Sequence, residues 1–172
     1  MVRMGDHAAS ARAEDTLVSI GLGSCIGLAL VDRRRAIAAL AHIVLPESPG
    51  QPAAAATPAR FADTAVPLLL EEVTRLGAAR ASLEAALVGG AQMFSFGGGQ
   101  AGNLDVGFRN EQATRSALRA AGIRVRAADT SGNKGRTIRV HVGTGVVTVR
   151  EAGGTEVQLL APPGARLAGS RT

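Results

Sequence analysis

The sequence has almost no aromatic side chains and only one cysteine. Of its 172 residues, 2% are aromatic, and tryptophan and tyrosine are absent. Hydrophobic residues still make up 46%, which excludes a disordered chain and allows one core built from aliphatic side chains. A single cysteine excludes an internal disulfide framework and is typical of a reducing compartment. We therefore expect one folded domain located in the cytoplasm.

Long hydrophobic runs are also missing. No run approaches the roughly 20 residues that cross a bilayer, and residues 1–15 contain no signal-peptide core. The net charge is +5, but the arginines are scattered and no aromatic residues alternate with them, so nucleic-acid binding is not favoured. One cysteine and three dispersed histidines lack the spacing of a zinc site, so we expect neither a metal nor a cofactor.

Periodicity and turn residues divide the chain into a flexible leader (1–15), a single domain (16–161) and a flexible tail (162–172). In the glycine-rich stretch 93–103, Phe94 and Phe96 are either core anchors or an exposed patch, and at least one is expected in the core. The predicted strands are Thr16–Gly21, Ile26–Val31, Ala36–Ala41, Ser82–Val88, Ile123–Ala128, Thr137–Val142 and Gly145–Arg150, and the predicted helices are Pro58–Leu76 and Arg109–Ala121.

The only cysteine and one histidine flank the predicted hairpin formed by the second and third strands. If Arg33-Arg34 is its two-residue turn, Asp32 faces Arg35, and the same register places Cys25 directly opposite His42. Cβ atoms of opposed residues lie roughly 4.5–5.5 Å apart. A thiol beside an imidazole is the arrangement that nucleophilic catalysis needs, and such pairing lowers a cysteine pKa below about 8.5. A one-residue slip would put the two side chains on opposite faces.

Each reactive residue also has a simpler interpretation. A lone cysteine on an apolar strand is often a small buried hydrophobe, and a lone histidine is often a satisfied core residue. His141 is the rival base, although the alternation of its strand points it to the polar face. His7 lies in the predicted leader and is a poor candidate.

Several sequence blocks resemble the chemoreceptor glutamine deamidase family, CheD. L-G-S-C-I-G-L-A-L-V-D contains the cysteine, and A-H-I-V-L-P follows some 17 residues later. The likeness continues through R-F-A-D-T-A-V-P-L-L-L, G-A-x-R-x-S-L-E-A-A-L-V-G-G-A-Q-M-F and V-G-x-R-N to I-R-V-R-A-A-D-T-S-G-N-K-G-R-T. It spans roughly residues 16–149.

The resemblance implies a fold and a chemistry. Family members are α+β proteins with mixed β-sheets in a sandwich-like core and two main helices packed outside, similar to the catalytic domains of deamidating toxins. They are cytosolic amidohydrolases that convert glutamines of methyl-accepting chemotaxis receptors to glutamate. The family's catalytic residues fall on Cys25 and His42, and its third polar residue, commonly Thr, falls on Ser19. The backbone N–H groups of Ser24 and Cys25 would then hold the oxyanion.

The resemblance also leaves an alternative function open. Family members bind a CheC-type phosphatase of the response regulator, so the chain is either a receptor deamidase, a non-catalytic regulator of that phosphatase, or both. The intact pair of Cys25 and His42 favours catalysis. No membrane insertion is expected, only peripheral contact with receptors.

Overall fold

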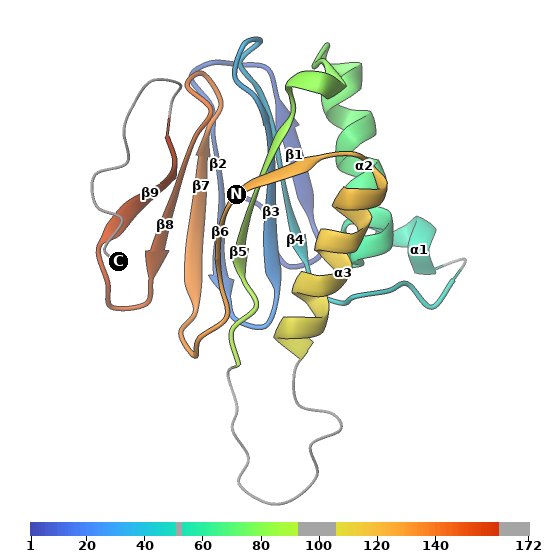
Figure 1. The fold of residues 1–172 in the computed structure, drawn as a ribbon, viewed down its shortest axis with the longest axis vertical. Helices are drawn as coiled ribbons and strands as arrows, with labels where there is room; N and C mark the ends of the chain where they lie inside the picture. Colours follow the sequence, from blue (N-terminus) through green and yellow to red (C-terminus); the bar gives the residue numbers. More distant parts are fainter. Residues whose placement is uncertain (51–52, 93–105, 162–172) are drawn as a thin grey trace, which may run out of the picture.

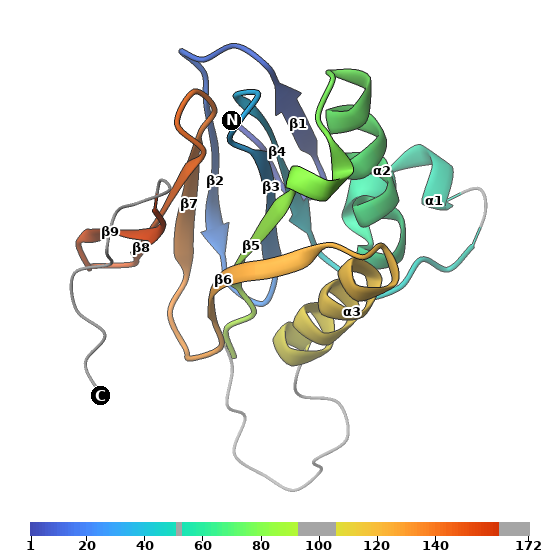
Figure 2. The ribbon, with the colours of Figure 1, turned by 45° about the horizontal axis from the view of Figure 1, so that its top comes forward.

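The computed structural model describes residues 1–50, 53–92 and 106–161 and has three layers (Figures 1 and 2). Two helices cover one face of a five-stranded sheet, and a four-stranded sheet covers the other face. No helix among these residues is long and apolar enough to cross a membrane. The strands are β1 (His7–Ser10), β2 (Thr16–Leu22), β3 (Ile26–Asp32), β4 (Ile37–Ile43), β5 (Glu84–Gly89), β6 (Arg124–Thr130), β7 (Arg136–His141), β8 (Val146–Glu151) and β9 (Glu156–Leu160), and the α-helices are α1 (Ala53–Ala56), α2 (Ala62–Arg75) and α3 (Val106–Ala120).

The larger sheet is mixed and the smaller one is antiparallel. The larger has the order β1-β4-β3-β5-β6, in which only β5 and β6 run parallel, and α3 connects those two strands. The smaller has the order β2-β7-β8-β9. The predicted α+β class, with mixed strands and two main helices outside, is confirmed, whereas the likeness to toxin domains stays a prediction.

The central hairpin is buried on both of its faces. Every residue of β3 and β4 is buried. Ile26 and Leu28 pack toward the helices, while Ala29 and Val31 pack toward the smaller sheet. Burial on both faces explains why these strands read as continuous apolar runs rather than alternating patterns.

The hairpin exists as predicted, but its register was wrong by two residues. Asp32 pairs with Ile37, so the loop has four residues and not the two-residue turn Arg33-Arg34. The carboxylate of Asp32 accepts hydrogen bonds from the N–H groups of Arg34 and Ala79, and Ala36 adopts a φ of 53°. These contacts stabilise the wider turn.

The N-terminal residues contain a strand that the sequence did not predict. The expected flexible leader includes β1, which pairs with β4, and Val2 is 2% exposed within the core between the sheets. Small residues in β1 let it lie at the edge of the larger sheet without a strong apolar pattern. Strand β9 was also missed. Phe94, Phe96 and the predicted tail lie outside the described residues.

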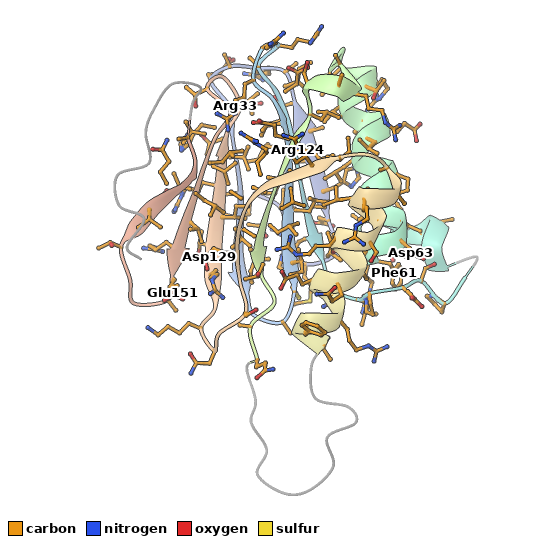
Figure 3. All side chains as sticks on the ribbon, viewed as in Figure 1. Arg33, Phe61, Asp63, Arg124, Asp129 and Glu151 are labelled. Atoms are coloured by element: carbon orange, nitrogen blue, oxygen red, sulfur yellow. The ribbon has the colours of Figure 1, made fainter. Side chains whose placement is uncertain are left out.

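The first long helix begins later than predicted. Pro58–Arg60 form a 3₁₀ turn, Phe61 is extended, and α2 starts at Ala62. Phe61 forms a β-bridge with Leu45 and buries its ring, which interrupts the helix that Pro58 was expected to begin (Figure 3). Gly77, with φ 102°, follows the helix end as predicted.

Candidate active site

Cys25 lies at the end of a loop that crosses from one sheet to the other. The loop joins β2 of the smaller sheet to β3 of the larger one. The backbone N–H of Gly90 donates to the carbonyl of Cys25 at 2.9 Å, and that of Ala91 donates to the carbonyl of Gly23 at 2.8 Å. Cys25 itself is 6% exposed. The end of β5 therefore fixes the backbone on which the thiol is mounted.

This attachment requires glycine at position 89. A Cβ placed there would lie 2.2 Å from the carbonyl oxygen of Cys25, and Gly89 has a φ of 116°. Only glycine has both the conformational freedom and the space for this approach. The Gly-Gly-Ala block of the family resemblance, residues 89–91, thus supports the cysteine loop, residues 23–25.

His42 shares a sheet face with Cys25 but is not directly opposite it. The cross-strand partner of His42 is Gly27, two residues after Cys25. A shift of two residues preserves the face, because side chains alternate with period two. Cys25 lies one residue before β3 and packs in the core between the sheets with Ala38 and Leu40, which alternate along β4 with the same parity as His42. The prediction of a shared face is therefore confirmed, and the prediction of direct opposition was wrong.

A hydrogen-bonded chain fixes the orientation and tautomer of His42. Ser19 Oγ donates to the carbonyl of Val2 at 3.0 Å and lies 2.9 Å from His42 Nδ1. A hydroxyl has one proton, so Ser19 Oγ accepts from Nδ1–H of a neutral His42. The ring then carries its lone pair on Nε2, which is buried and has no hydrogen-bond partner among the described residues.

The backbone of His42 is held by the segment before β1. Its carbonyl accepts from the N–H of Gly5, and its N–H donates to the carbonyl of Asp6, each at 3.0 Å. The Val2 carbonyl accepts from Ser19, which contacts the ring. Residues 2–6 therefore hold both the backbone of His42 and the hydroxyl that contacts its imidazole. Sequence analysis missed this role because backbone groups leave no residue signature.

Burial acts on both reactive groups and favours their neutral forms. Burial raises the pKa of the Cys25 thiol, and the nearby charge of Arg60 opposes this only in part. Burial also lowers the pKa of His42, against the opposing charge of Asp6. The expectation that pairing lowers the cysteine pKa is therefore contradicted, since desolvation outweighs the neighbouring charge. At neutral pH the site holds a thiol and an uncharged imidazole.

The other histidines are placed away from the thiol. His141 pairs with Thr16 at the opposite end of β2 from the cysteine loop, with Thr16 Oγ1 3.2 Å from its Nδ1. His7 pairs with Ala41, so it lies on the opposite sheet face from His42. Within the described parts of the chain, no group of three or more His, Cys, Asp or Glu residues could hold a metal.

Asn110 is a further buried polar residue beside the candidate site. It is 0% exposed on α3, and its Nδ2 lies 2.9 Å from the carbonyl oxygens of both Ser24 and Val44. It belongs to the V-G-x-R-N block, to which sequence analysis gave no role. An asparagine on the inner face of an otherwise amphipathic helix was the signal available.

The three-layer fold has a Cys, a His and a Ser between its sheets, and most of the chain matches known proteins of one family. A family model described as "CheD chemotactic sensory transduction" matches residues 44–151. The chain therefore belongs to the CheD family. The matched range begins two residues after His42 and so does not include Cys25, His42 or Ser19.

Individual relatives agree with this family. A Clostridium novyi protein is 42% identical over 137 residues, which cover 80% of this chain and 83% of the relative. A Desulforamulus reducens protein is 40% identical over 152 residues (88% and 90%), and one from Clostridium botulinum strain Hall is 41% identical over 139 residues (81% and 85%). All three bear the name "Probable chemoreceptor glutamine deamidase CheD".

Proposed function

We propose that this protein is a cysteine-dependent deamidase that converts glutamine side chains of chemotaxis receptors to glutamate in the cytoplasm. The observation that carries the mechanism is the chain from the Val2 carbonyl through Ser19 to His42, which leaves Nε2 as a base on the sheet face shared with Cys25. The substrate class is supported by the names of the relatives.

The reaction begins from the neutral pair. His42 Nε2 takes the thiol proton as Cys25 Sγ adds to the amide carbon of glutamine, and the carbonyl electrons move to oxygen. Backbone N–H groups at Ser24 and Cys25 hold that oxyanion. Forming the charged pair during attack, rather than beforehand, agrees with the raised thiol pKa and the lowered imidazole pKa.

The second half of the reaction releases ammonia and consumes water. The intermediate collapses, the C–N bond breaks, and the proton on His42 Nε2 leaves with the nitrogen as ammonia. His42 then takes a proton from water as its oxygen adds to the thioester carbon. Breaking the C–S bond returns the thiol of Cys25 and leaves glutamate. The net reaction is an amide plus water giving a carboxylate and ammonia.

The test is the mass of a receptor fragment incubated with the protein. We expect wild type to add one dalton at particular glutamines and release ammonia, Cys25→Ala to do neither, and His42→Gln to fall at least about a hundredfold. His141→Gln is the matched control and should retain the wild-type rate. If wild type and Cys25→Ala give identical receptor masses, the proposal fails.

Binding to a CheC-type phosphatase, which the family resemblance also implies, stays a prediction. We assign none of the described residues to it. Co-purification of the two proteins, with a Cys25→Ala variant as the comparison, separates this role from catalysis because binding needs no thiol.

A further inference from the structure

Asn110 makes two contacts that only the nitrogen of its side-chain amide, and not the oxygen, can make. Both of its neighbours, the Ser24 and Val44 carbonyls, are acceptors at 2.9 Å, so Nδ2 must face them and each receives one of its two hydrogens. Its Oδ1 is buried and has no partner among the described residues. The side chain therefore acts here as a double donor.

These two carbonyls belong to the two reactive segments. Ser24 directly precedes Cys25, and Val44 follows His42 by two residues and comes directly after the end of β4. One side chain on α3 thus joins the cysteine loop to the end of the histidine strand. Gly107 makes this possible, because a Cβ there would lie 2.5 Å from the carbonyl oxygen of Gly90. Because glycine has no Cβ, the first turn of α3 can lie against Gly90, whose N–H bonds to the Cys25 carbonyl.

The bond to Ser24 also determines where the next N–H points. In a trans peptide the carbonyl of one residue and the N–H of the next point in opposite directions. Holding the Ser24 carbonyl toward Asn110 turns the Cys25 N–H away from it. Among the described residues, no acceptor bonds to this N–H. The carbonyls of Gly23, Ser24 and Cys25, in contrast, each accept a hydrogen bond.

We propose that Asn110 is the positioning residue of the oxyanion site, because it orients the Ser24–Cys25 peptide so that the Cys25 N–H faces the substrate's carbonyl oxygen. This inference rests on the proposed function and deepens it. A donor aimed at the developing oxyanion accelerates attack on a carbonyl but contributes nothing to displacement at a saturated carbon. The two kinds of reaction therefore separate this role from simple support of the fold.

The experiment compares Asn110→Ala with Thr114→Ala. Thr114 is the matched control because it is also fully buried and lies one turn later on α3, and because its hydroxyl donates to the Asn110 backbone carbonyl at 2.8 Å and to no other group among the described residues. One probe is a short peptide with an aldehyde in place of the glutamine carboxamide. Its carbonyl accepts Cys25 Sγ, the C=O π bond opens, and the thiol proton ends on oxygen as a hemithioacetal. The other probe is iodoacetamide, which alkylates the thiol with loss of iodide.

We expect Asn110→Ala to weaken aldehyde binding at least about tenfold relative to Thr114→Ala, and to lower kcat for deamidation far more than it changes KM. Alkylation rates of the two variants at one pH should agree within about threefold. Equal aldehyde affinities, or a parallel loss of aldehyde binding and alkylation, would overturn the inference, as would a wild type that does not bind the aldehyde. If the aldehyde result holds while wild type leaves receptor masses unchanged, the positioning role stands and the proposed substrate fails.

Discussion

At the scale of single residues, Cys25 and His42 are kept uncharged by their burial. The two residues are 6% and 2% exposed, and each has one opposing charge nearby, Arg60 for the thiol and Asp6 for the imidazole. A resting thiolate–imidazolium pair would need both pKa values to move the other way. The site therefore resembles a serine–histidine pair, because the nucleophile loses its proton only during attack.

This electrostatic state predicts different pH profiles for alkylation and for deamidation. Because burial raises its pKa, Cys25 should react with iodoacetamide slowly at pH 7, and the rate should rise about tenfold per pH unit to at least about pH 9. Deamidation should lose rate only as pH falls through the lowered pKa of His42, below about 6.5, because protonation removes the base.

Whole-protein mass spectrometry measures the alkylation directly, since Cys25 is the only cysteine. Cys25→Ser supplies the unlabelled control. An alkylation rate that is already level between pH 7 and pH 8 would show a resident thiolate and contradict this assignment of charge.

At the scale of elements, the segment before β1 belongs to the candidate site. It supplies the carbonyl to which Ser19 donates, and Gly5 and Asp6 bond to the backbone of His42. Val2 also donates its N–H to the Val18 carbonyl at 2.7 Å along β2. Residues 2–6 therefore bridge the two sheets on the side where the imidazole lies.

Deleting residues 2–4 should change the tautomer of His42. Without the Val2 carbonyl, the Ser19 hydroxyl can donate to Nδ1, which moves the ring proton to Nε2 and removes the base. We expect imidazole ¹⁵N chemical shifts to report a lower Nδ1–H fraction and the deamidation rate to fall at least about tenfold. Val2→Ala, which keeps the carbonyl and removes only buried carbon, should retain the wild-type tautomer. If the deletion also retains it, Val2 has no role in orienting Ser19.

The hairpin shows what the sequence could and could not predict at this scale. Two apolar runs around a charged break located β3 and β4, and the parity of the register put Cys25 and His42 on one face. The turn length was not readable, because it depends on Asp32 bonding to Ala79, which is distant in sequence. Strand β1 was missed for a related reason. Its small side chains give no apolar pattern, and the strand is held by its pairing with β4, which is distant in sequence.

The site residues divide in the same way. Cys25, His42 and Ser19 were found through reactive residue types and family motifs. Asn110 and the Val2 carbonyl were not, because their part is to hold backbone groups or other side chains, and such contacts appear only once the chain is folded.

At the scale of the whole molecule, the two sheets are joined near the site by a buried guanidinium. Arg136 on β7 bonds to Asp129 on β6 and to Glu151 on β8, at 3.0 and 3.3 Å, so it links the larger sheet to the smaller one. Figure 3 labels the two carboxylates, Asp129 and Glu151. It also donates to the Ser131 carbonyl at 2.7 Å. The N–H of Ser131 in turn donates to the carbonyl of Gly89 at 3.0 Å.

This connection predicts that Arg136 affects both stability and the cysteine loop. Arg136→Lys cannot reproduce the forked contacts, and we expect it to lower the free energy of unfolding by about 1–3 kcal/mol. Arg139→Lys is the matched control on the same strand, because its ion pair with Glu156 is partly exposed and should contribute at most about 1 kcal/mol. Denaturant unfolding measures both.

Because Gly89 packs on the Cys25 carbonyl, the deamidation rate of Arg136→Lys should also fall, under conditions where both variants are fully folded. Equal stabilities and equal rates in the two variants would mean that the sheets are held together without this cluster.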